Sequence, residues 1–302
     1  MLMSTAHIGQ MQDSAMANTQ LLVGYLSGQH KLGASTDEQA AALLHDVSHT
    51  ALSHTIDAAF GRVVHETDKE TFLDGTTLRE IVERHSLRND VFNEEHYSLV
   101  ERSAPDLCAD RLDYALRDAL AFGVLSQRQI ASIVEHVIAI DKVIVMDDID
   151  AARTLAQSYI QCDTIAWSNP YHAALYHFAA AAIREAHDSG ELSHDALWSA
   201  ESCAQFWTSI SSSANPLVRQ LASLVDANMQ VHEVEDPTVE LNSSCTLVSI
   251  RLKARVIDPK IFDARSGKLE RLSDLDQSYC KDMARYTASK AGIKHFVVQH
   301  SR

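Results

Sequence analysis

Three histidines and two aspartates lie within thirteen residues of this chain, and this stretch restricts its fold and chemistry more than any other. It follows the apolar run 40–44, which predicts the end of a buried helix. Imidazole and carboxylate groups are costly to bury unless they bind a metal ion or each other. The stretch therefore predicts a functional cluster at a helix end. Its members are His45, Asp46, His49, His54 and Asp57.

The order of these residues favours a metal centre over a solvated surface. Adjacent His45 and Asp46 can both reach one ion from a helix end, and this donor pair suits Mg, Mn, Fe or another divalent transition metal. A single His–Asp pair occurs by chance in many proteins, but His49 and His54 follow on a stretch with little other charge. Asp57 lies three residues after His54, on the same helix face, so it can orient that ring and hold a proton on it.

A second charged stretch, 105–118, predicts a helix that opens after Pro105. Charged helices usually face solvent, but this one also carries an apolar stripe with its charges beside it. The stripe consists of Leu107, Leu112, Leu116 and Leu120. Such a helix can pack against the core and still present charged side chains to a site.

Both stretches resemble signatures of one known family. The string 45–54 closely resembles the signature of the HD-domain metal-dependent phosphohydrolases, most of all the branch of deoxynucleoside triphosphate triphosphohydrolases. The string 110–118 resembles the third signature of that family, which supplies the last metal ligand. The resemblance implies a mainly α fold, an HD-domain helical bundle, to which the sequence adds a small C-terminal α+β appendage.

The resemblance also implies a role for each matching residue. A histidine near the start of the first helix is the family's first ligand, and His7 stands 38 residues before His45, which matches in order and spacing. Arg111 and Tyr114 would face the substrate phosphates and sugar, with Asp118 at the sugar edge. His65 matches a family His–Glu pair at the lip of the site, where it would contact phosphate or transfer a proton. The implied metal ligands are His7, His45, Asp46 and Asp110.

Two departures from the family pattern concern substrate recognition. Ser4 stands where the family usually has an arginine, three residues before the first ligand. The segment that normally precedes it, and that helps to form the base and sugar pocket, is lacking. We therefore expect a shortened N-terminus.

The predicted reaction is metal-dependent hydrolysis of a phosphoester or phosphoanhydride. The cofactor would be one divalent ion (Mn, Fe, Mg, Zn or Ni), with His54 as general acid or base, held by Asp57, and His49 and Arg111 on phosphate oxygens. By resemblance the substrate is a deoxynucleoside triphosphate, and a monophosphate or cyclic nucleotide stays open. The alternative is a catalytically weak HD module that binds a nucleotide or a protein partner. An ordered His7 beside His45 would favour the enzyme.

Composition restricts the partners and the compartment. The net charge is 26 − 41 = −15, which argues against nonspecific binding to nucleic acid or to an anionic membrane. The five cysteines are scattered without a CxxC pair and indicate reduced thiols inside a cell. No apolar run approaches the length of a membrane span. We expect a cytoplasmic or nuclear protein, and the resemblance allows a homo-oligomer.

We divide the chain into an HD phosphohydrolase domain at 1–150, a helical extension at 151–230 and a small α+β region at 231–302. The aromatic and histidine residues between Trp167 and His177 predict core and lid packing. Predicted helices lie at 10–27, 36–44, 50–60, 77–85, 105–118, 151–161, 170–189, 193–211 and 279–291. Predicted strands lie at 142–146, 245–250, 252–257, 267–272 and 295–299.

Overall fold

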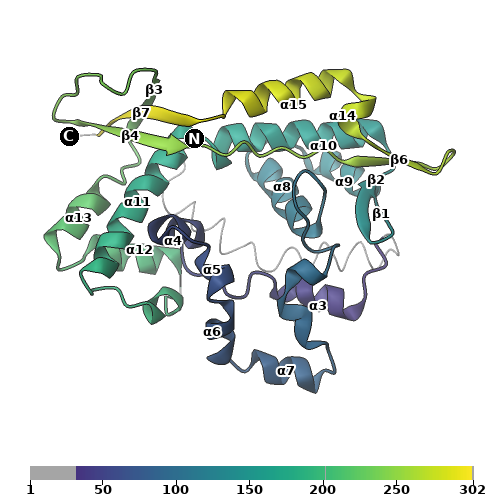
Figure 1. Cartoon of the computed structure of the whole chain (residues 1–302), viewed down its shortest axis with the longest axis horizontal. Helices are drawn as coiled ribbons and strands as arrows, with labels where there is room; N and C mark the ends of the chain where they lie inside the picture. Colours follow the sequence, from purple (N-terminus) through teal and green to yellow (C-terminus); the bar gives the residue numbers. More distant parts are fainter. Residues whose placement is uncertain (1–31, 201, 301–302) are drawn as a thin grey trace.

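The computed structural model describes residues 32–200 and 202–300, and it is mainly helical, with about 52% helix and 13% strand (Figure 1). This confirms a mainly α class with a smaller β component. His7, Ser4 and the predicted helix at 10–27 lie outside the described residues. Within the described residues, no helix is long and apolar enough to cross a membrane.

Helix α3, Thr36–Leu44, brings the His–Asp pair to its C-terminal end. The helix has the predicted bounds because Ser35 and Glu38 form a capping box at its start, with Ser35 Oγ accepting from the Glu38 amide. Helix α4, Ser53–Phe60, starts three residues later than predicted. Leu52 takes a left-handed backbone conformation, φ 55°, which residues inside a helix do not adopt, so the helix can begin only after it.

Short helices connect α4 to the second charged helix, α8, Ala109–Ala121. The predicted start after Pro105 is wrong, because Leu107 pairs with Ile144 in an antiparallel bridge and keeps this stretch extended. The predicted helix at 77–85 is confirmed as α7. The short elements are α5 (Val64–Thr67), α6 (Lys69–Asp74), α7 (Leu78–Arg84), η1 (Asn89–Phe92) and η2 (Glu94–His96).

The two longest helices of the described residues follow, and they are joined by a single π-helical turn, η3, Asp163–Trp167. The predicted single helix at 193–211 is wrong. Ser202 accepts a hydrogen bond from the Gln205 amide and thereby caps a new helix start, so the stretch divides into two elements. The helices of this part are α10 (Ile149–Cys162), α11 (Pro170–Asp188), η4 (Asp195–Trp198), α12 (Cys203–Ser211) and α13 (Pro216–Ser223).

Two small sheets complete the described fold, in the strand orders β1-β2-β5-β6 and β3-β7-β4. β2 pairs in parallel with β5 through Met146 and Ile261, so the first and third predicted segments share a sheet, and the proposed division stays a prediction. The strands are β1 (Val137–Ile140), β2 (Val143–Met146), β3 (Gln230–Val234), β4 (Cys245–Arg251), β5 (Lys260–Asp263), β6 (Lys268–Arg271) and β7 (Ile293–Gln299). The remaining helices are α9 (Gln127–Glu135), α14 (Leu272–Leu275) and α15 (Gln277–Ser289).

The predicted strand at 252–257 is wrong. This stretch is extended but belongs to no sheet, because the amide of Arg255 donates to the buried side chain of Asp163 in place of a neighbouring strand. In Figure 1 the segment runs from β4 towards β5 along α10.

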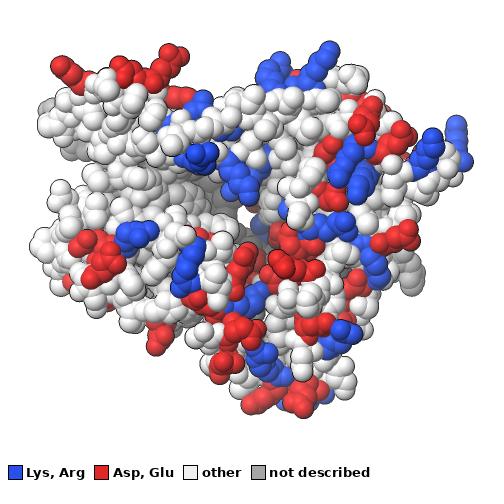
Figure 2. Space-filling view, in the orientation of Figure 1, with Lys and Arg blue, Asp and Glu red and all other residues white. Residues whose placement is uncertain are grey.

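The buried apolar residues form separate clusters, and the candidate site lies where two of them meet. One cluster packs α3, α8 and α10 together, while another packs α4 against α11 and α12. Figure 2 shows that the surface is hollowed between these two parts of the molecule. The first charged stretch therefore spans both clusters, with His45 at the end of α3 on the same cluster as α8, and with His54 and Asp57 on α4.

Candidate active site

His45 is the residue around which the site is built. It caps the C-terminal end of α3, and its Nδ1 donates to the carbonyl of Ala42 at 2.9 Å. This bond places the proton on Nδ1 and directs Nε2 towards Asp46 Oδ2 at 3.2 Å and Asp110 Oδ1 at 3.4 Å. The side chain is 6% exposed, and within the described residues no hydrogen bond of good geometry satisfies Nε2. A buried lone pair without a donor is costly unless a cation takes it.

Three ligand atoms fit one such cation. One atom each from His45, Asp46 and Asp110 lie within 4.8 Å of one another. One imidazole nitrogen and two carboxylate oxygens suit a divalent ion such as Mn, Fe, Zn or Mg. The bond from Nδ1 to a backbone carbonyl is the usual outer contact of a metal-ligating histidine, because it fixes the tautomer and the ring plane. The residues present therefore fit the ion that the sequence predicts.

The electrostatics of this group favour positive charge between the carboxylates. Burial alone would lower the pKa of His45, but the facing carboxylates of Asp110 and Asp46 outweigh this effect and raise the pKa to about 11. Burial likewise opposes ionisation of Asp46, yet contacts with His45 and His49 hold its pKa well below the usual range. Asp46 thus remains charged and available to a cation.

His49 connects the ligand cluster to a second group of titratable residues. Its Nε2 lies 3.2 Å from Asp46 Oδ1. Its ring centroid lies 4.0 Å from that of His65 and 5.8 Å from that of His54. Three imidazoles therefore gather on one side of the metal ligands, although they come from three different elements of the chain.

Asp57 lies between His54 and His65. Its Oδ2 is 3.6 Å from His54 Nδ1 and 3.3 Å from His65 Nδ1, and its Oδ1 accepts from the Val64 amide at 2.7 Å. Burial opposes ionisation of this carboxyl, but the bonds from His54, His65 and the Val64 amide keep its pKa below the usual range. The two imidazoles therefore share one charged carboxylate.

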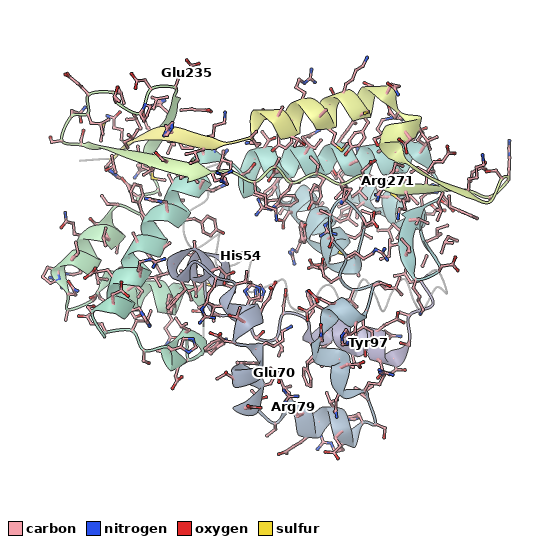
Figure 3. The ribbon with its side chains drawn as sticks, viewed as in Figure 1. His54, Glu70, Arg79, Tyr97, Glu235 and Arg271 are labelled. Carbon is pink, nitrogen blue, oxygen red and sulfur yellow. The ribbon has the colours of Figure 1, made fainter. Side chains whose placement is uncertain are left out.

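The two histidines on Asp57 differ in their access to solvent. The His65 side chain is largely buried, and its Nδ1 lies 3.2 Å from Ser53 Oγ. The His54 side chain is 65% exposed, and Figure 3 shows it on the side of α4 that faces the hollow. His54 can therefore meet a bound substrate directly, while His65 is held in place behind it.

Sequence reasoning missed Lys69. Its Nζ donates to the carbonyl of His45 at 3.0 Å, to the carbonyl of Phe92 at 3.2 Å and to Glu94 Oε2 at 2.6 Å. The lysine is buried and holds the backbone of His45, a candidate metal ligand, in place. It was overlooked because it lies in a run of charged residues, 65–70, that has the composition of a solvated helix start.

Arg111, the predicted phosphate contact, forms its hydrogen bonds with nearby residues of the protein. Its Nη1 donates to the carbonyls of Arg102 and Asp106, both at 2.8 Å, and to Cys108 Sγ at 3.2 Å. Its Nη2 lies 3.5 Å from Glu101 Oε1. In this arrangement Arg111 stabilises the loop before α8.

The other predicted substrate residues of α8, Tyr114 and Asp118, lie on an aromatic wall. The hydroxyl of Tyr114 bonds to that of Tyr159, and both rings pack edge-on against Trp167, with centroids 5.3 and 4.9 Å away. Trp167 Nε1 donates to Asp118 Oδ2 at 2.8 Å. Burial raises the pKa of Asp118. Trp167, predicted only as packing, thus also holds a residue of the predicted substrate site.

The fold and the His–Asp–Asp cluster define a mainly helical protein with a candidate centre for one divalent cation. The chain is 38% identical over 242 residues to the metal-dependent phosphohydrolase cns2 of Cordyceps militaris. The matched region covers 77% of this chain and 67% of that protein. The chain is also 30% identical over 241 residues to the uncharacterized protein YdhJ of Bacillus subtilis, covering 77% and 70% of the two chains. No model of a known protein family matches the chain.

Solved structures support the same fold. A phosphohydrolase from Bacteroides thetaiotaomicron superposes with a TM-score of 0.65 at 16% identity, over 97% of this chain and 87% of that chain. A hypothetical protein from Aquifex aeolicus superposes with a TM-score of 0.60 at 11% identity, over 96% and 82%. This chain belongs to the HD-type superfamily of metal-dependent phosphohydrolases. The narrower resemblance to deoxynucleoside triphosphate triphosphohydrolases stays a prediction.

Proposed function

We propose that this phosphohydrolase acts on a nucleotide and uses one divalent ion held by His45, Asp46 and Asp110. His7, the fourth predicted ligand, lies outside the described residues. The observation that carries the proposal is the buried, unsatisfied Nε2 of His45 between two carboxylates. A deoxynucleoside triphosphate is the first candidate substrate.

The bound ion would neutralise phosphate charge and lower the pKa of a water molecule, which makes water a better nucleophile at neutral pH. The protein groups around it have separable tasks. His45, Asp46 and Asp110 hold the ion, and the second nitrogen of His45 is fixed by the carbonyl of Ala42. His49 lies between this group and the other imidazoles, so it can donate a hydrogen bond to a phosphate oxygen.

Proton transfer is assigned to His54, supported by Asp57 and His65. Asp57 is charged over the whole neutral range, so it stabilises the protonated form of a ring on its Oδ2. His54 is the exposed member of the group and can deliver that proton to the leaving oxygen or accept one from water. His65 is buried between Asp57 and Ser53, so it orients the carboxylate.

The geometry of α8 supports a nucleotide-sized substrate. Asp110 lies in its first turn, and Tyr114 and Asp118 follow one and two turns later. Eight residues of helix span about 12 Å, which is the scale of a nucleotide. A substrate with its scissile phosphate near Asp110 would therefore place its sugar along Tyr114 and Asp118.

The test combines elemental analysis with a hydrolysis assay. We expect about one metal ion per chain, because the three ligand atoms fit one cation. With Mn present, we expect the protein to release phosphate or triphosphate from members of a panel of nucleotides. Asp46→Ala should abolish both metal binding and turnover and leave the fold intact by circular dichroism. Asp74→Ala, at an exposed aspartate of α6, is the matched control. A metal-free protein that hydrolyses none of the nucleotides would favour the binding module.

A further inference from the structure

Arg255 is held rigidly at the edge of the aromatic wall by a residue that is fully buried. Its amide donates to Asp163 Oδ2 at 2.9 Å, and its Nη1 lies 3.5 Å from Asp163 Oδ1 and donates to the Trp167 carbonyl at 3.2 Å. The Asp163 side chain is 0% exposed, and Tyr286 also donates to its Oδ2 at 2.8 Å. Both the backbone and the head group of Arg255 are therefore fixed to η3.

The guanidinium keeps donors for a further partner. Within residues 32–200 and 202–300, its hydrogen bonds run through Nη1 alone, whereas a guanidinium carries five N–H donors. The side chain is 38% exposed. Figure 2 shows lysine and arginine side chains on the rim of the hollow where the segment after β4 crosses, as traced in Figure 1.

Trp167 connects Arg255 to the predicted substrate residues. Its carbonyl holds the arginine, its ring packs on Tyr114, and its indole N–H holds Asp118. Burial raises the pKa of Tyr159, and the nearby charge of Arg255 acts in the opposite direction, as expected for a cation close to this wall. Trp167 thus lies between Arg255 and the two residues that would face the sugar, Tyr114 and Asp118.

We propose that Arg255 binds a second phosphate of the substrate, separate from the scissile phosphate at the metal ligands. The inference rests on the proposed function, because it takes the position of the first phosphate from it. A chain with a net charge of −15 needs a local cation to hold a second anionic group, and the Nη1 of Arg111 is already engaged in its own loop. Arginine suits the task because its planar fork matches phosphate geometry.

The second phosphate could come from two parts of a nucleotide. It could be the end of a 5′-polyphosphate chain, or it could sit on another hydroxyl of the sugar. Three substrates separate these sources, namely a nucleoside 5′-monophosphate, the 5′-triphosphate and the 3′,5′-bisphosphate. The variants are Arg255→Gln, which removes the charge, Arg255→Lys, which keeps it, and Arg251→Gln, at an exposed arginine four residues earlier, at the end of β4.

We expect Arg255→Gln to raise KM about 10-fold for the substrate whose second phosphate reaches it, because a charge-assisted contact is lost. A 10-fold change corresponds to about 1.4 kcal/mol. The KM for the monophosphate and the kcat values should change less than about twofold. Arg255→Lys should retain part of the affinity, and Arg251→Gln should behave like the wild type. An equal change for all three substrates, or none for any, overturns the proposal.

Calorimetric Kd values for the same nucleotides on Mn-loaded protein separate this proposal from the proposed function. An Arg255-dependent Kd without turnover supports the second phosphate site and rejects hydrolysis of these nucleotides. Turnover that is insensitive to Arg255 supports the hydrolase and rejects the second phosphate site. Failure of the wild-type protein to bind any of the three nucleotides overturns both.

Discussion

Replacement of Lys69 by Met tests whether a buried lysine holds the metal centre in place. The Lys69 ammonium donates to the carbonyls of His45 and Phe92 and to Glu94. Methionine has a similar length but no donor, so two buried carbonyls lose their partner. Each unsatisfied group costs about 1–3 kcal/mol, and the variant no longer buries an ammonium group, which offsets part of this cost, so we expect a loss of about 2–4 kcal/mol in unfolding free energy.

The same change should weaken metal binding. His45 is a proposed ligand whose backbone carbonyl would lose its anchor, and loss of an outer contact typically lowers metal affinity about 10–100-fold. Urea denaturation of the metal-free protein measures the first effect, and competition with a chelating dye measures the second. Lys281→Met, at an exposed position of α15, is the control for loss of one positive charge.

The two measurements together can refute the reasoning. Unchanged stability would mean that water replaces the ammonium without cost, which contradicts the burial of Lys69. Lower stability with unchanged metal affinity would mean that the lysine supports the fold but does not set the position of His45.

Three further predictions concern the metal ligands and the imidazole group. Chelation should lower the melting temperature, and Mn at about 100 times its Kd should restore about 2.7 kcal/mol, which differential scanning calorimetry would show; equal stability in both states would contradict a bound ion. In the chelated protein the pKa of His45 is raised to about 11, above an unfolded value of about 6.5, so its stabilisation is fully present below pH 6.5 and is lost as pH rises towards 11. Denaturation of the chelated protein at pH 6.5 and 9.5 should show this fall, and Asp110→Asn should reduce it. Asp57→Asn should lower kcat about 100-fold or more with unchanged metal content, because the carboxylate beside His54 is gone, and wild-type kcat would exclude a role for Asp57 in proton transfer.

Local signals in the sequence predict local structure well in this protein. Helix α3 has its predicted bounds because Ser35 and Glu38, three residues apart, decide where it starts. The mainly helical class and membership of the metal-dependent phosphohydrolases, both expected from the two signature strings, are confirmed. The structure places His45, Asp46 and Asp110 together, while their roles as ligands remain to be tested by the metal analysis.

Contacts between distant residues explain what the sequence could not show. Lys69 looks like a surface residue until its partners 24 and 25 positions away, His45 and Glu94, are known. The stretch 252–257 has strand composition, but its amide partner is a side chain 92 residues earlier, at Asp163. The parallel pairing of β2 with β5 likewise joins segments more than a hundred residues apart in the chain. Periodicity and spacing carry no information about such pairs.

The candidate site is divided between two cores, so the loop that joins them sets the distance between its two groups of residues. His45 and Asp110 belong to elements packed in the core of α3, α8 and α10, whereas His54 and Asp57 lie on α4, which packs on α11 and α12. The loop 45–52 joins the two. Within it Ser48 donates to the carbonyl of His65 at 2.7 Å and accepts from Trp198 Nε1 through its own carbonyl at 2.8 Å. Because these bonds attach the loop to α5 and to η4, they hold the proposed proton-transfer residues at a fixed distance from the candidate metal ligands.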